Sequence, residues 1–249
     1  SPSCRDPPAA RRVQRRIAMP ACLRPLEGAA PLDERELKFL PDAAAARLVW
    51  AIAAQHLRPQ SAHGPFTYSR TTYFDTADLA YLRSPGHRLR VREYSTPTGI
   101  DAPPIAEPGC YLELKRSAEG RRAKTRLALR PDQLAAALAA AHPTPLTPWV
   151  TTWYRRQALV DGAGRLRLTL DDRLLLCRPR PFGAPFDELT DADVIAPGPA
   201  FVLEYKAWAA PPPWLTRALA DLPEATGFSK FVLGMRALGQ PSTRAAAHA

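Results

Sequence analysis

Two glutamates and a lysine stand at alternate positions early in the chain: Glu34, Glu36 and Lys38. On a β-strand, residues two apart lie on the same face, so these three side chains would point the same way. Two neighbouring carboxylates can hold a divalent metal ion, and the lysine can bind the phosphate oxygens that such an ion bridges. The spacing therefore predicts a metal and phosphate site, with a solvated strand face as the ordinary alternative.

Three arginines repeat the same spacing further along: Arg88, Arg90 and Arg92. Like charges this close on one strand face repel one another unless anions lie among them. Guanidinium groups form forked, bidentate hydrogen bonds with phosphate oxygens. The run therefore favours a phosphate-binding face, although an exposed stripe would tolerate the repulsion at modest cost.

The alternation of charged and apolar residues recurs in several other short runs. Each run would place an ionic stripe on one face of a strand and an apolar stripe on the other. Because both signs occur and cations dominate, we expect the ionic faces to converge on a shared cavity suited to a polyanion. The other cations in such runs are Lys115, Lys124, Arg126, Arg156, Arg167 and Lys206, the last of them two residues after Glu204.

The elements that would position these residues are mostly strands. Turn signals such as Glu119-Gly120 and Asp161-Gly162 link neighbouring runs into hairpins, whose strands are antiparallel. Eight antiparallel strands can close into a barrel, which removes exposed edges. The sequence thus predicts an α+β, mainly β fold: an eight-stranded antiparallel closed barrel with a few flanking helices. The predicted strands span 34–40, 66–76, 87–94, 110–116, 121–129, 149–160, 165–171, 174–178 and 201–208, and the helices 41–56, 131–142, 212–222 and 228–238.

Composition places the chain among globular proteins with anionic partners. Of its 249 residues, 46% are hydrophobic, and 34 basic against 24 acidic side chains give a net charge of +10. Residues 1–31 are rich in Arg, Pro and Ala without periodicity, so we predict a disordered arm there. One domain is expected over 32–239, followed by a disordered tail over 240–249.

Several classes of protein are not supported by the sequence. The four cysteines, Cys4, Cys22, Cys110 and Cys177, have no metal-ligand spacing, which predicts reduced thiols in a cytoplasmic protein. No run approaches the roughly 20 apolar residues of a membrane helix, so no membrane span is predicted. The cations alternate along strands and no recognition helix or RNA-binding motif is present, so nucleic acid is not an expected partner.

Eight short motifs, taken in order along the chain, resemble the polyphosphate polymerase (VTC) domain of the triphosphate tunnel metalloenzymes, a CYTH-like superfamily. The resemblance covers about 33–238. The motifs are Glu34-Arg-Glu-Leu-Lys38, Thr72-Tyr-Phe-Asp75, Arg88-Leu-Arg-Val-Arg92, Tyr111-Leu-Glu-Leu-Lys115, Tyr154-Arg-Arg156, Arg167-Leu-Thr-Leu-Asp171, Leu203-Glu-Tyr-Lys206 and Phe228-Ser-Lys230.

The resemblance implies a tunnel that transfers the γ-phosphate of ATP onto inorganic polyphosphate with a divalent metal, Mn²⁺ or Mg²⁺. ATP and polyphosphate are then the expected partners, and Glu204, with Glu36 and Glu34, would hold the metal. The expected catalytic residues are Lys38, Arg90, Arg92, Lys115, Arg156 and Lys230, and the expected substrate-binding residues are Arg88, Lys124, Arg126, Arg167 and Lys206.

Two other functions stay open at this point. The pair of Glu34 and Glu36 resembles the two metal-binding glutamates of the hydrolytic and cyclase branch of the superfamily. A metal-dependent tripolyphosphate or nucleoside triphosphate hydrolase is therefore the second possible function. A non-catalytic polyphosphate-binding module is the third possibility. Asp171 is expected to pair with a cation of the tunnel for structure rather than to contact metal.

Overall fold

The computed structural model describes residues 35–60, 66–84, 86–96, 105–106, 109–118, 121–185 and 189–240. The predicted arm over 1–31 and Glu34 lie outside these residues, as does the predicted tail from residue 241 onward. Cys4 and Cys22 also fall outside them, whereas Cys110 and Cys177 are buried free thiols.

One antiparallel sheet dominates the fold, as predicted. Eight strands follow one another along a single path, and every neighbouring pair is antiparallel. Three short strands join its flanks: β2 (Arg58–Pro59) on β8, β5 (Ile105–Ala106) on β4 and β10 (Val194–Pro197) on β9. The path runs β1 (Arg35–Phe39), β11 (Phe201–Ala207), β9 (Leu166–Cys177), β8 (Thr147–Val160), β3 (Thr67–Asp75), β4 (Arg88–Thr96), β6 (Cys110–Ala118) and β7 (Arg121–Leu129).

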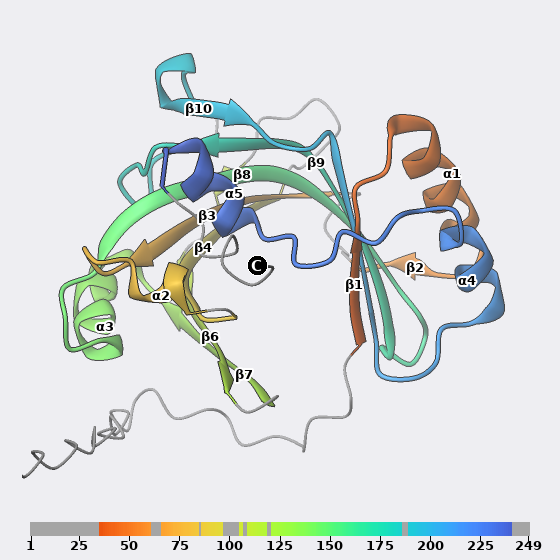
Figure 1. Cartoon of the computed structure of the whole chain (residues 1–249), viewed down its shortest axis with the longest axis horizontal. Helices are drawn as coiled ribbons and strands as arrows, with labels where there is room; N and C mark the ends of the chain where they lie inside the picture. The colour runs from red at the N-terminus through yellow and green to blue at the C-terminus, as the bar shows by residue number, and fades with distance from the viewer. Residues whose placement is uncertain are drawn as a thin grey trace, which may run out of the picture.

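The path curves into an arch that stays open (Figure 1). Within the described residues its two end strands, β1 and β7, do not pair with each other. The predicted closed barrel is therefore wrong, although the number of strands along the path is right. Closure depends on strand tilt and on the stagger of the hydrogen-bond register, and neither quantity can be read from alternation along single strands.

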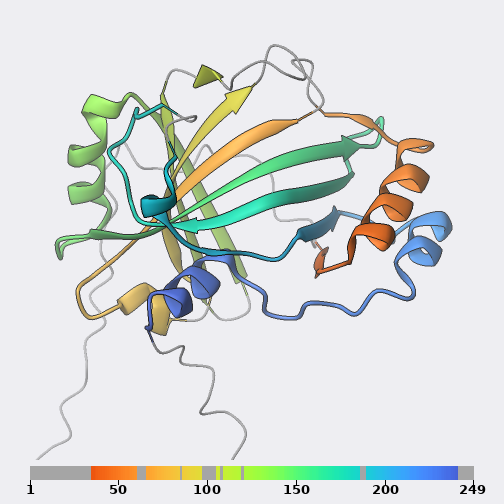
Figure 2. The same ribbon diagram turned by 90° about the horizontal axis from the view of Figure 1, so that it is seen from above.

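Helices cover the convex side of the arch at both ends. Figure 2 shows α1 (Ala43–Ala54) and α4 (Pro213–Leu219) together at one end, and α3 (Leu134–Ala141) at the other. α1 begins after Asp42, whose carboxylate accepts a hydrogen bond from the backbone N–H of Ala45 at 2.8 Å, an N-cap that satisfies one free amide. A 3₁₀ turn, η2 (Pro131–Gln133), leads into α3.

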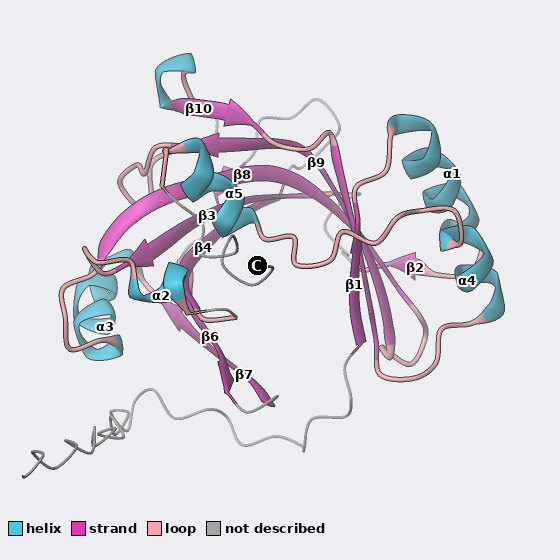
Figure 3. Cartoon of the chain, in the orientation of Figure 1, coloured by secondary structure: helices cyan, strands magenta, loops and turns pink. Residues whose placement is uncertain are grey.

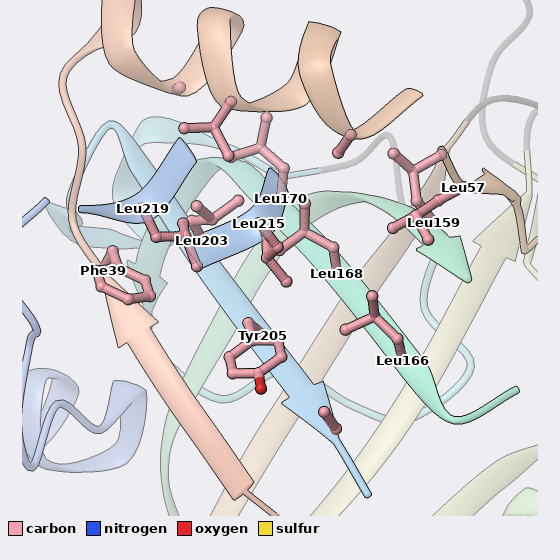
Figure 4. Close-up of a cluster of buried hydrophobic side chains, with 14 residues drawn as sticks. Phe39, Leu57, Leu159, Leu166, Leu168, Leu170, Leu203, Tyr205, Leu215 and Leu219 are labelled. Carbon is pink, nitrogen blue, oxygen red and sulfur yellow. The ribbon is translucent and has the colours of Figure 1, made fainter. Parts of the chain in front are cut away.

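Two hydrophobic clusters lie between these helices and the sheet. Under α1 and α4, the cluster in Figure 4 includes Leu168, Leu203, Tyr205 and Leu215, all at most 1% exposed. Under α3, Leu134 packs with Leu89, Val91, Leu112 and Leu114. The apolar residues of the alternating strands therefore face outward beneath the helices, which leaves the charged residues of the same strands on the concave side.

A terminal helix, α5 (Lys230–Ala237), lies on the concave side beneath β8 (Figure 3). Phe231 stacks on Tyr73 of β3 with ring centroids 5.1 Å apart. A Cβ added at Gly234 would come within 2.7 Å of the Val150 side chain, so the absence of a side chain there allows close packing. The hydroxyl of Ser229 accepts a hydrogen bond from the backbone N–H of Val232. This N-cap fixes the start of α5 at Lys230.

Some elements differ from those predicted. The strands expected over 165–171 and 174–178 form one strand, β9. Arg173 has a positive φ of 52° at a bulge in this strand, where β9 carries one residue more than the facing stretch of β8. The sequence analysis also missed β2, β5 and β10, the short helix α2 (Ala80–Arg83) and the 3₁₀ turn η3 (Asp191–Asp193). Among the described residues, every helix is too short or too polar to cross a bilayer.

Candidate functional site

The strands at one end of the arch bring their charged side chains to the concave side. Arg88 of β4 lies opposite Lys115 of β6, and Arg90 lies opposite Glu113. The next pairing, between β6 and β7, sets Lys115 against Lys124 and Glu113 against Arg126. Since directly paired residues share a face, the ionic stripes of all three strands form one continuous surface.

The strands at the other end of the arch, β1, β11 and β9, also bring charged side chains to the concave side. Glu36 of β1 lies opposite Lys206 of β11, and Lys38 lies opposite Glu204. Lys206 is in turn paired with Arg167 of β9. Further along β9, Asp171 is paired with Arg156 of β8.

β3 and β8 join the two ends through polar residues on the same side. Thr71 lies opposite Arg92 on one flank and Thr152 on the other. We call this concave surface the ionic face. It brings together every predicted site residue that the structure describes, with Lys230 added from α5: Glu36, Lys38, Arg88, Arg90, Arg92, Lys115, Lys124, Arg126, Arg156, Arg167, Glu204, Lys206 and Lys230.

At the β1 edge, two lysines and two glutamates alternate. The Nζ atoms of Lys38 and Lys206 lie 2.5 and 2.9 Å from the carboxylate oxygens of Glu36. The same two atoms lie 4.0 and 3.7 Å from the oxygens of Glu204. Burial alone would raise the pKa of Glu36, but the two ammonium groups outweigh it and hold the pKa well below its usual range. Glu36 is therefore ionised throughout the neutral range.

A second carboxylate, Asp171, holds two cations from different elements. Its oxygens accept from Nε and Nη2 of Arg156 at 2.5 and 2.8 Å and from Nζ of Lys230 at 2.6 Å. The phenol ring of Tyr154 lies beside this group, 4.6 Å from the Lys230 nitrogen. Burial acts to raise the pKa of Tyr154, yet Arg92 and Arg156 outweigh it and lower that pKa to about 8.

Arg88 and Arg167 differ from the other cations of the ionic face. Within the described part of the chain, neither has a carboxylate at ion-pair distance. Burial lowers the pKa of Arg88, while the charges of Glu36 and Glu204 act in the opposite direction. Those two glutamates belong to β1 and β11, and Figure 1 shows β1 across the open arch from the end that contains β4.

Sequence reasoning did not single out Glu113 or Tyr154 as site residues. Glu113 is only 2% exposed and lies among four cations of the ionic face. Its alternation with Lys115 could have placed it on that face. Tyr154 could have been found in the same way, since it stands two residues before Arg156.

Carboxylate oxygens suitable for a hard divalent cation are few on the ionic face. In the part of the chain that the structure describes, no three His, Cys, Asp or Glu side chains cluster closely enough to hold a metal ion. Glu36 and Glu204 are nevertheless near neighbours on adjacent strands, sharing contacts with Lys38 and Lys206. One or two carboxylates suffice for Mg²⁺ when phosphate oxygens and water complete its shell, so this pair fits such an ion.

A family model described as the VTC domain matches residues 139–239. The predicted resemblance to this family is confirmed over these residues, which make up about half of the range 33–238 where it was expected. The VTC match extends from the end of α3 through α5, and it contains Arg156, Arg167, Glu204, Lys206 and Lys230. The earlier strands β1, β3, β4, β6 and β7 precede it in the chain and complete the ionic face. No curated protein matches the chain.

Several solved structures are similar to the chain along most of its length. A protein of Pyrococcus horikoshii OT3 has 11% identity and a TM-score of 0.49, covering 82% of this chain and 98% of its own. The Hippeastrum protein HpAC1, named an adenylyl cyclase and described by a dominant triphosphatase activity, has 17% identity, a TM-score of 0.45 and coverage of 84% and 97%. A Vibrio parahaemolyticus protein named an adenylate cyclase has 14% identity, a TM-score of 0.47 and coverage of 80% and 97%.

Proposed function

We propose that the ionic face binds ATP and inorganic polyphosphate and transfers the γ-phosphate of ATP onto the end of the polyphosphate chain. The observation that carries this proposal is the convergence of cations from seven strands and one helix on a single concave surface. The match of residues 139–239 to the VTC domain agrees with it.

The charges of the ionic face suit a chain of phosphates better than a single carboxylate or a neutral ligand. Arg88 and Arg167 have no carboxylate of their own within the described residues, so their guanidinium groups are available for bidentate bonds to phosphate oxygens. Arg156 and Lys230 are already oriented by Asp171. Cations fixed before the ligand arrives lose little entropy on binding it.

The transfer needs no nucleophile from the protein. A terminal oxygen of polyphosphate attacks the γ-phosphorus, the bond from that phosphorus to the bridging oxygen breaks, and ADP leaves with the bonding electrons. The attacking oxygen is already ionised, so no general base is required. The work of the protein is alignment of the two reactants and stabilisation of charge on the equatorial oxygens.

Glu36 and Glu204 would hold a divalent cation, Mn²⁺ or Mg²⁺, beside the phosphates. When bound, such an ion neutralises phosphate oxygens and polarises the phosphorus. For this to happen, Lys38 and Lys206 would move from the carboxylates toward phosphate oxygens. That exchange keeps the charge of both glutamates compensated.

A hydrolase is the second candidate, because the carboxylate pair of Glu36 and Glu204 suits its metal ion as well. A metal held there would equally serve the attack of water on tripolyphosphate or a nucleoside triphosphate. The two reactions share their binding site and differ only in the acceptor.

Product analysis separates these activities. Purified chain is incubated with γ-labelled ATP and Mn²⁺ or Mg²⁺, and the products are resolved on a gel. A ladder of labelled polyphosphate with matching ADP supports the polymerase. Labelled orthophosphate alone identifies the hydrolase, and binding of tripolyphosphate without any turnover identifies a binding module and rejects both enzymes.

A further inference from the structure

Glu113 is the most heavily contacted carboxylate of the ionic face. Its oxygen Oε2 accepts from Nε of Arg90 at 2.7 Å and lies 3.8 Å from Nη1 of Arg92. Its other oxygen, Oε1, lies 3.3 Å from Nζ of Lys124 and 3.7 Å from Nε of Arg126. One carboxylate thus links cations from β4 with cations from β7.

The four cations differ in how firmly the rest of the fold holds them. Arg92 is buried and also donates to the hydroxyls of Thr71 and Tyr94. Lys124 and Arg126 have side chains that are 54% and 41% exposed, and both belong to β7, the last strand of the path. Of these two, Arg126 has further contacts, since its guanidinium carbon lies 3.8 Å from the centre of the Tyr111 ring and its Nη2 donates to the Tyr94 hydroxyl. An end strand has a neighbour on one side only, so side-chain contacts matter more for where its residues point.

Repulsion acts against this arrangement. Lys115 and Lys124 lie directly opposite each other, and like charges in that position are destabilising. Without a central anion, the exposed cations lower their energy by extending into solvent, where their charges are screened. A buried carboxylate at the centre keeps them on the ionic face.

We propose that Glu113 is a positioning residue, which holds Arg90, Lys124 and Arg126 on the ionic face so that they can contact a bound polyphosphate together. The inference rests on the proposed phosphate-binding function of that face. It predicts that removal of the negative charge of Glu113 weakens anion binding, although the loss of a negative charge beside an anion site would ordinarily strengthen it. A carboxylate that merely competes with the anion would give the opposite result.

The test uses Glu113→Gln, which keeps the shape and one acceptor oxygen but removes the charge. Tripolyphosphate binding to the full chain is measured by calorimetry at several salt concentrations, with circular dichroism as a check on folding. We expect Kd to rise at least fivefold and the salt dependence of binding to become shallower, by about 2 in slope if two cations no longer reach the anion. A purely structural role would leave the slope unchanged.

The control is Glu93→Gln. Glu93 is a buried carboxylate on β4 that pairs with Arg70 at 2.8 Å on the opposite face of the sheet. This variant should leave Kd and the salt slope for tripolyphosphate as they are. A parallel change in both variants would overturn the positioning role, because it would reflect general loss of stability.

A double variant, Lys124→Gln with Arg126→Gln, tests the same inference without touching the buried carboxylate. Both side chains are partly exposed, so folding should persist. We expect the salt slope to fall as in Glu113→Gln. Glu113→Gln added on top should raise Kd by a smaller factor than it does in the wild-type chain, because only Arg90 then still depends on the carboxylate. Unaltered or tighter binding in Glu113→Gln, or independent effects in the combined variant, would overturn the inference, whereas a wild-type chain that fails to bind tripolyphosphate would reject the proposed function itself.

Discussion

Arg156 of β8 and Asp171 of β9 form a bidentate ion pair, and Lys230 of α5 donates a hydrogen bond to the same carboxylate. Asp171 is 1% exposed, and its pKa is held well below the usual range because Arg156 and Lys230 outweigh the effect of burial. The pair therefore ties the terminal helix to the sheet and orients two proposed phosphate ligands at once.

Asp171→Asn tests how much this link between α5 and the sheet stabilises the fold. Removing one partner of a buried ion pair costs about 3 kcal/mol, because the remaining cations lose their counter-charge. We expect the free energy of unfolding in urea to fall by about that amount. The matched control is Asp132→Asn, since Asp132 is exposed and pairs with the exposed Arg130, and it should leave the free energy of unfolding almost unchanged. Equal stability of the two variants would contradict the tie.

The acid side of the stability profile should depend on the same carboxylates. Burial would raise the pKa of Glu36, Glu113 and Asp171, but their cationic neighbours outweigh it and lower all three. The unfolded chain, with ordinary pKa values near 4, then binds more protons than the folded chain as the pH falls. Stability contributed by these groups is complete above about pH 5 and is lost progressively at lower pH.

Chemical denaturation between pH 7 and pH 3 measures this effect. Asp171→Asn should flatten the profile in its acid limb, since one of the three groups no longer titrates. A profile that is flat from pH 7 to pH 3 in the wild-type chain would contradict the lowered pKa values.

Arg173 offers a test of backbone strain. Its φ of 52° lies in the left-handed region, which glycine adopts without steric cost and other residues adopt at about 1 kcal/mol. Because the side chain is exposed, Arg173→Gly should leave packing intact and stabilise the chain by about 0.5 kcal/mol, measured by urea unfolding. Arg165→Gly, at an exposed position without positive φ, should instead be neutral or destabilising.

The strands and their ionic face could be predicted because alternation is a local property. Arg88, Arg90 and Arg92 share a face in any straight strand, and the outward Leu89 and Val91 required a covering layer, which α3 supplies. The antiparallel pairing of β6 with β7 and of β8 with β9 followed from the turn signals between them.

The openness of the arch and the role of Glu113 could not be predicted in this way. Whether β1 meets β7 depends on the summed tilt and stagger of all eight strands. The four contacts of Glu113 come from β4 and β7, and only the three-strand register brings those residues within reach of one carboxylate. The gap between the predicted strands at 165–171 and 174–178 contains Arg173, whose positive φ interrupts the regular backbone of β9 without ending the strand.

Arg88→Gln should separate binding from folding most clearly. Arg88 faces Lys115 and has no carboxylate at ion-pair distance among the described residues, so its charge opposes the fold rather than supporting it. Loss of a charged hydrogen-bond donor to phosphate costs about 1.5–3 kcal/mol, equivalent to a roughly 10- to 150-fold weaker Kd for tripolyphosphate. We expect that loss together with an unchanged or higher free energy of unfolding. Arg130→Gln, which removes an exposed arginine beside Asp132, should alter neither quantity. If Arg88→Gln bound tripolyphosphate as tightly as the wild-type chain, the ionic face would not be the phosphate site.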